Sequence, residues 1–399
     1  MDKNLKHAEV HRLASLELNL LNYSRSLPPT VLENARLDAG TLVYDPNGEV
    51  LFVRFPLLQN GVSSGYADIA AHTALGAPLL AVAPTAVWNE QAVLAQSREA
   101  FWEQARGKDK KVHHKPPYDE VRFVAYSFPK LAVQFLREKK EVVMLECFTW
   151  IPVPPAAERP DRKKLEPANF ERWSLLDEMD ERRKEENHRK FEERIKRLHE
   201  SELNPVSVGL ISRALVEPLI SIIRLTLTNE IHFSRRSTDH HVCYELRGQE
   251  TNVWCVAASV QMLLDFYRYN YSQSKIAQQL GLGTLANPNG LPYARVGDVV
   301  TQLQVMSSNA LTAKMLTSPV FYDFVSELDQ NRPMISFIPG HSRTVAGYTE
   351  SLFVLLGFGG FRGLLVYDPW PPNAGVITRW ENFDTQIYQY AYTAQVTTI

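Results

Sequence analysis

The alternation of hydrophobic and polar residues near the start of the chain is typical of strands joined by tight turns. Residues 41–55 form two apolar-rich arms around Asp45-Pro46-Asn47-Gly48, a turn sequence that favours a β-hairpin. Two more strands are expected over 120–127 and 141–153, with a helical segment between them that starts near Pro129.

Apolar residues over 86–106 recur at the spacing of a helix. Together with the expected strands, this helix predicts an α+β domain over residues 1–155. Its position ahead of every catalytic motif in the chain suggests a regulatory domain or a pro-domain.

A connector is expected over 156–235. Prolines cluster over 152–160, which is typical of a linker, and residues 171–200 are mostly charged with a thin apolar stripe. A second, apolar helix is expected over 206–228. The charged helix is interpreted as a spacer or docking helix, with a specific partner-binding helix as the alternative.

Length and composition narrow the class of protein. A chain of 399 residues is too long for one ordinary core and suggests two or three domains. Hydrophobic residues make up 45% and charged residues 22%, as in globular proteins, and the formal net charge is -2. So small a charge offers no general attraction to nucleic acid or to an anionic membrane, and a nucleic-acid partner is not expected.

The sequence shows no run of ~18 apolar residues, the length that a membrane span needs. The first residues do not resemble a secretory signal. Cys147, Cys243 and Cys255 are an odd set without close pairing, which fits a reducing compartment. We therefore expect a cytoplasmic protein, with non-classical secretion as the alternative.

The main chemical candidate is Cys255, which opens an apolar segment of good helix formers. A thiol at a helix N-terminus meets unpaired backbone N–H groups and the positive end of the helix dipole, which stabilise the thiolate. Gln249 lies six residues ahead. Its side-chain amide and the Cys255 N–H are groups that can donate to an oxyanion, and the resemblance described below implies that role for them.

His341 follows Pro339-Gly340 at an expected loop-to-strand junction, and an imidazole there suits proton transfer near neutral pH. Asp368 ends a predicted strand and can orient the imidazole. Asn373 and Asp384 are rival candidates for that orienting role.

The order of Gln249, Cys255, His341 and Asp368 resembles papain-like cysteine peptidases. The resemblance covers roughly 240–399 and is closest to the compact bacterial branch of bacteriocin-leader-peptidase-like and AvrRpt-type effector peptidases. It implies a papain-like domain over 236–399, with a helical half led by the cysteine and an antiparallel β half that carries the histidine and aspartate. Val256 stands where many relatives carry Trp.

No cofactor is expected. His240, His241 and Cys243 are a weak metal-ligand candidate, because they lack a spaced fourth ligand. Gly357, Gly359 and Gly360 lie between strand-like runs and predict a hairpin turn rather than a phosphate-binding loop.

The leading hypothesis is a cysteine peptidase that acts on protein or peptide substrates through an acyl-thioester on Cys255. Residues 1–230 are expected to inhibit it until cleavage over 229–248, near Arg235-Arg236, or a partner signal releases it. One alternative is an acyltransferase or amidase of the transglutaminase type. Another is a non-catalytic binding module on the same fold.

Overall fold

The computed structural model describes residues 4–23, 35–84, 88–108, 116–155, 172–200, 226–230, 245–352 and 360–397. These residues form two compact units. The N-terminal unit includes 4–155 and 172–200, and the C-terminal unit includes 226–352 and 360–397, apart from the gaps given above. Each unit mixes helices and strands, so the α+β class predicted from the sequence is confirmed.

The N-terminal unit is built on a sheet with the strand order β5-β4-β3-β2-β6-β7-β8, and β1 pairs with β3. All pairs are antiparallel except β2 with β6. Its described elements are α1 (His7–Tyr23), β1 (Arg36–Leu37), β2 (Thr41–Tyr44), β3 (Val50–Gln59), β4 (Val62–Ala70), η1 (Thr73–Leu75), β5 (Leu79–Ala83), α3 (Glu90–Lys108), β6 (Glu120–Ser127), β7 (Lys130–Arg137), β8 (Lys140–Glu146), α4 (Leu175–Glu178) and α5 (Glu181–Glu200).

The hairpin expected over 41–55 is present as β2 and β3. The helix expected from Pro129 is wrong, because the segment forms β7, which pairs with β6 on one side and β8 on the other. Residues 131–136 of this strand are all buried. A short apolar run that is buried on both faces looks the same in a helix and in a central strand, so only the long-range pairing decides between them.

The strand expected over 141–153 is shorter and ends at Glu146. The Glu146 carboxylate accepts hydrogen bonds from the N–H groups of Phe148 and Thr149, at 2.9 and 2.7 Å, and closes a turn there. The chain then folds back, and the Val153 N–H donates to the Met144 carbonyl at 2.8 Å.

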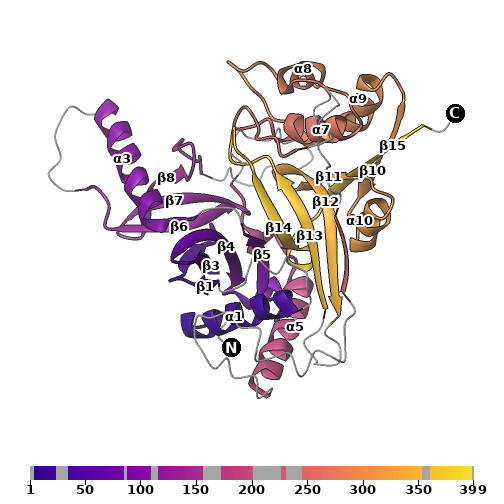
Figure 1. Cartoon of the computed structure of the whole chain (residues 1–399). Helices are drawn as coiled ribbons and strands as arrows, with labels where there is room; N and C mark the ends of the chain where they lie inside the picture. Colours follow the sequence, from indigo (N-terminus) through magenta and orange to yellow (C-terminus); the bar gives the residue numbers. More distant parts are fainter. Residues whose placement is uncertain are drawn as a thin grey trace. The chain divides into compact units, whose positions relative to one another are not determined.

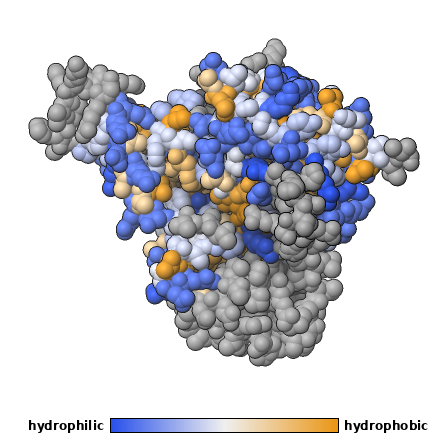
Figure 2. Space-filling view, turned by 45° about the horizontal axis from the view of Figure 1, so that its top comes forward, coloured by the Kyte–Doolittle hydropathy of each residue, from blue (hydrophilic) through white to orange (hydrophobic). Residues whose placement is uncertain are grey.

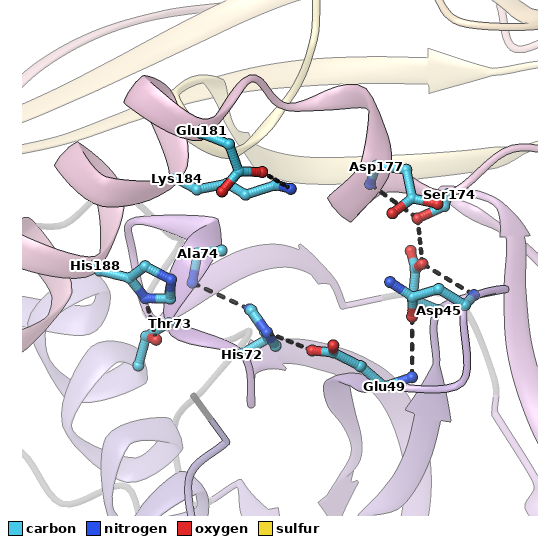
Figure 3. A network of polar contacts seen from close by, with 11 residues as sticks. Asp45, Glu49, His72, Thr73, Ala74, Ser174, Asp177, Glu181, Lys184 and His188 are labelled. Carbon is cyan, nitrogen blue, oxygen red and sulfur yellow. Dashed lines mark hydrogen bonds and ion pairs between the residues drawn. The ribbon is translucent and has the colours of Figure 1, made fainter. Parts of the chain in front are cut away.

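The charged segment over 171–200 contains two helices that pack within the N-terminal unit. Ser174, the N-cap of α4, donates to the buried carboxylate of Asp45, and the Leu175 N–H donates to the same carboxylate at 3.0 Å. His188 of α5 bonds to Thr73 at 2.5 Å (Figure 3). Polar contacts therefore attach both α4 and α5 of this charged segment to the rest of the N-terminal unit. The expected division of the chain at 155 and 235 stays a prediction.

The C-terminal unit is built on a sheet with the strand order β10-β15-β11-β12-β13-β14 (Figure 1). Its described elements are β9 (Thr226–Glu230), α7 (Cys255–Phe266), α8 (Gln273–Gln279), η3 (Tyr293–Arg295), α9 (Asp298–Met306), β10 (Leu311–Thr317), α10 (Phe321–Leu328), β11 (Met334–Ile338), β12 (His341–Leu352), β13 (Gly360–Asp368), β14 (Val376–Asn382), η5 (Phe383–Thr385) and β15 (Tyr390–Val396).

Strand β11 shows how this sheet supports two cores. Ile335 and Phe337 belong to a cluster with the apolar residues of α7, α8 and α9. Met334 and Ile338 belong to a second cluster with Phe321 and other apolar residues of α10. Because successive side chains of a strand point to opposite faces, helices cover both faces of the sheet at this strand.

Strand β9 belongs to the C-terminal sheet. It pairs antiparallel with Gly347–Ser351 of β12. Residues 226–228 of the apolar helix expected over 206–228 are therefore strand. The rest of that helix, the Arg235-Arg236 site, and the glycine turn at 357 and 359 lie outside the described residues.

Among the residues that carry a hydropathy colour in Figure 2, hydrophilic side chains predominate and smaller groups of hydrophobic ones lie between them. Among the residues that the structure describes, no helix is long and apolar enough to cross a membrane.

Candidate active site

His341 begins β12 directly after a two-residue hairpin turn. Gly340 has a φ of 66°, a conformation that glycine adopts without strain, and Ile338 pairs with His341 across the turn. The Gly340 N–H donates to the Tyr293 hydroxyl at 2.8 Å. The sequence expectation of a histidine at a loop-to-strand junction is therefore confirmed.

Asp368 is the last residue of β13, which lies beside β12 in the sheet. His341 Nε2 donates to Asp368 Oδ1 at 2.6 Å, and the two residues are 4% and 5% exposed. The Trp370 N–H donates to the same oxygen at 2.8 Å. Asp384, a rival for this role, instead pairs with Arg362. The structure therefore brings His341 together with Asp368.

The surroundings of Asp368 favour its charged form. Burial by itself would raise the pKa of Asp368, but the charge and hydrogen bond of His341, the charge of Arg343 and the Trp370 N–H together lower the pKa below its usual value. An ionised carboxylate fixes the tautomer of a neutral imidazole and stabilises an imidazolium.

Arg343 is a residue of this region that the sequence reasoning missed. It is 0% exposed and forms a bidentate pair with Glu381 of β14, with one of the two contacts at 2.9 Å. The Tyr388 hydroxyl donates to the same carboxylate at 2.7 Å. The sequence carries no clear signal for this pair, because Arg343 stands among other polar residues of β12 and only the fold shows that it is buried.

Cys255 is the first residue of α7 and is partly buried. Trp254, the residue before it, provides no side-chain cap to the helix. Helix α7 packs against β12, where the Thr344 hydroxyl contacts Met262 Sδ at 3.5 Å. The two elements that begin with Cys255 and His341 therefore lie against each other.

Gln249 is fully buried, and its backbone bonds to the segment that follows Asp368. Its N–H donates to the Pro369 carbonyl at 2.9 Å, and its carbonyl accepts from the Asn373 N–H at 2.8 Å. Its side-chain Nε2 donates to the Thr251 carbonyl at 2.6 Å. A primary amide nitrogen carries two hydrogens, so one donor is used by Thr251.

Three of the expected residues are therefore linked through the sheet and its following loop. His341 contacts Asp368, and Gln249 is bonded to the residue after Asp368. Cys255 lies six residues beyond Gln249, at the start of α7. Val256, the departure from the family pattern, is 4% exposed and packs in the core with Trp254.

The weak metal-ligand candidates His240, His241 and Cys243 lie outside the described residues. Within the part of the chain that the structure describes, no three His, Cys, Asp or Glu side chains gather in a way that could hold a metal ion.

Comparisons with known proteins bear on the C-terminal unit. A search of curated proteins finds no match. Among solved structures, UfSP from C. elegans matches with 12% identity and a TM-score of 0.29, over 46% of this chain and 37% of that one. The chain thus spans little more than a third of that structure. Residues 242–397 match the model of the Peptidase_C39 like family, so the C-terminal region is similar to this peptidase family.

Proposed function

We propose that the C-terminal unit is a cysteine peptidase in which Cys255 is the nucleophile, His341 the proton carrier, Asp368 its orienting carboxylate and Gln249 an oxyanion donor. The observation that carries the proposal is the buried contact between His341 and Asp368, within a region similar to a peptidase family. The four residues stay in the roles that the sequence suggested.

In the first half of the reaction, the Cys255 thiolate attacks the carbonyl carbon of a peptide bond and forms a tetrahedral intermediate. The carbonyl oxygen takes the negative charge. The imidazolium of His341 then gives its proton to the leaving amine as the carbon–nitrogen bond breaks. An acyl-thioester on Cys255 remains, and His341 is left neutral.

In the second half, His341 removes a proton from a water molecule, whose oxygen attacks the thioester carbon. The carbon–sulfur bond then breaks, and the acid product leaves. Cys255 returns as a thiolate, and His341 returns as an imidazolium. Asp368 keeps its charge throughout and favours the imidazolium in both halves.

The arrangement of the imidazole supports these roles. Because Asp368 engages Nε2, proton exchange with the thiol and the leaving amine goes through Nδ1. The helix start at Cys255 supports a thiolate independently of His341, through the dipole and the N–H groups of the first turn.

The second donor of the Gln249 amide and the Cys255 N–H are the proposed oxyanion hole. Such donors act mainly on the transition state, because the charge on the oxygen develops only there. Full burial of Gln249 strengthens this effect, since water screens the interaction less.

We also propose that the N-terminal unit regulates the peptidase, as an inhibitory region that cleavage releases. Residues 229 and 230, at the start of the expected cleavage range 229–248, belong to β9. Residues 248–250 are tied by several hydrogen bonds. Cleavage within the range 229–248 stays a proposal, and residues 231–244 of that range lie outside the described residues.

The test of the proposed activity uses purified full-length protein, wild type and Cys255→Ala. Each is incubated with a defined mixture of peptides, and new termini are identified by mass spectrometry. The mixture and the chain itself are both analysed, so that self-cleavage is detected. New termini only with the wild type would support a cysteine peptidase. A parallel sample contains an added amine, and its attachment to the acyl product without hydrolysis would instead identify an acyltransferase. If no product depended on the thiol of Cys255, the result would argue for a binding module.

A further inference from the structure

Gln273, the first residue of α8, forms hydrogen bonds to the backbone on both sides of Gln249. Its Nε2 donates to the Gly248 carbonyl at 2.8 Å, and its Oε1 accepts from the Glu250 N–H at 2.9 Å. One side-chain amide thus binds one residue before and one residue after Gln249, as a neighbouring strand would do.

Gln249 itself is held from a second direction. Its own N–H and carbonyl bond to Pro369 and Asn373, in the loop after Asp368. An added Cβ at Gly248 would lie 2.4 Å from the Ala374 nitrogen, so this backbone passes too close for a side chain. The segment around Gln249 is therefore fixed between α8 and the loop 369–374.

Helix α8, which carries Gln273, is held by its N-cap and by core packing. Ser272 caps α8, its hydroxyl accepting from the Lys275 N–H at 3.2 Å, and Ile276 and Ala277 pack in the core with the apolar residues of α7. Gln273 is only 2% exposed. Burial of an amide is costly unless its donor and acceptor are both used, and here the segment around Gln249 uses both.

We propose that Gln273 is a positioning residue that holds the Gln249 amide where it can stabilise the oxyanion. The proposal rests on the proposed peptidase function. It explains why a polar side chain is buried at the start of α8, and it gives the helical half of the unit a direct part in forming the oxyanion hole. Gln273 does not touch the substrate in this assignment.

The experiment compares full-length wild type with Gln273→Met, which keeps the length of the side chain but removes both hydrogen bonds. The matched control is Gln261→Met, because Gln261 also donates its amide to a backbone carbonyl, but to that of Tyr271 and not to one next to Gln249. Labelled casein is the substrate, a peptide aldehyde reports on the tetrahedral adduct, and iodoacetamide reports on the thiolate.

We expect Gln273→Met to lower kcat about 10-fold, with KM within about twofold of wild type, because a displaced donor weakens the transition state more than the ground state. The aldehyde should bind more weakly by a similar factor, and the rate of Cys255 alkylation should not change. The control should keep the wild-type kcat. A folded Gln273→Met enzyme with wild-type kcat and aldehyde affinity would overturn the proposal.

A double-mutant cycle separates positioning from a general structural role. If Gln273 acts through Gln249, Gln273→Met should lower kcat less than about twofold in a Gln249→Ala background, because contacting residues are not additive. Equal effects in both backgrounds would contradict the proposal. The underlying peptidase function is tested separately, by comparing casein hydrolysis by wild type and by Cys255→Ala. Hydrolysis that is lost in Cys255→Ala supports that function whatever Gln273→Met does.

If Gln273→Met does not fold, Gln273→Glu decides. It keeps the acceptor for the Glu250 N–H, and only its protonated form can donate to the Gly248 carbonyl. Its kcat relative to wild type should therefore rise as the pH is lowered, and this recovery should be absent in the Gln249→Ala background. A ratio that does not depend on pH would refute the positioning role.

Discussion

His341 and Asp368 form a buried hydrogen bond of 2.6 Å between the first residue of β12 and the last residue of β13. The Trp370 N–H binds the same carboxylate oxygen. These two hydrogen bonds hold the carboxylate of Asp368 in place. Because the carboxylate in turn holds His341 Nε2, the orientation of the imidazole is fixed before any substrate binds. In the proposed peptidase this contact directs Nδ1 to the proton transfers.

Replacement of the nucleophile tests the proposed activity most directly. Cys255→Ala and His341→Ala should each lower kcat/KM at least ~10²-fold, because each removes a reacting group. Cys147→Ala is the matched control, since it removes a buried thiol of the N-terminal unit. Its hydrolysis should match wild type. Casein hydrolysis, with circular dichroism to check the fold, measures the effect, and a fully active Cys255→Ala would show that the nucleophile is assigned wrongly.

Gln249→Ala should lower kcat with little change in KM, by a barrier increase of about 2 to 4 kcal/mol. Alkylation of Cys255 by iodoacetamide should continue at the wild-type rate, because thiolate formation does not involve the amide. Gln261→Ala should leave kcat unchanged. An unaltered kcat in Gln249→Ala would remove this residue from the oxyanion hole.

Asp368→Asn should be milder than loss of His341, and its effect on stability should depend on pH. The folded pKa of Asp368 is lowered, so its carboxylate contributes stability above its usual pKa of 3.8, and this contribution is lost as the pH falls below that value. The difference in the free energy of unfolding between wild type and Asp368→Asn should therefore be present at neutral pH and shrink in acid. Urea titrations at several pH values measure it, and a difference that grows in acid would contradict the assignment.

Asp265 of α7 should show the opposite dependence on pH. Burial raises its pKa to about 6, although the charge and hydrogen bond of Arg247 oppose the shift. The contribution of Asp265 to stability is therefore full below 3.8 and is lost as the pH rises through about 6. Asp265→Asn should remove this loss, with a gain relative to wild type on the order of 1–3 kcal/mol at neutral pH. Urea titrations measure the free energy of unfolding of both proteins. The assignment would be wrong if that of Asp265→Asn changed between pH 3.8 and about 6 as it does in wild type.

Release of the N-terminal unit should increase activity if that unit inhibits the peptidase. One variant carries a recognition site for an added protease within 231–244, so that cutting leaves β9 on the N-terminal piece. A second variant carries the site just ahead of residue 226, so that cutting leaves β9 on the C-terminal piece. Hydrolysis of casein should rise after cutting and fall again when a polypeptide covering 1–224 is added. Wild type without the added recognition site, treated with the same protease, is the control. Equal activity before and after cutting would leave targeting or partner binding as the role of this unit.

Local signals in the sequence determined the features that depend on neighbouring residues. The Asn47-Gly48 turn predicted the β2–β3 hairpin, the run of helix formers after Cys255 predicted α7, and the proline after Asp368 predicted the end of β13. The peptidase was indicated not by a local signal but by a resemblance, which the order of Gln249, Cys255, His341 and Asp368 and the motifs around them carry.

Only the tertiary structure decided the features that depend on distant partners. Strand β7 looked helical because its apolar run has no clear period, and pairing on both sides makes it a central strand. Strand β9 is defined by β12, more than a hundred residues later. Gln273 and Arg343 look like ordinary polar residues in the sequence, and their burial is stable only because Gly248, Glu250 and Glu381 meet them in the fold.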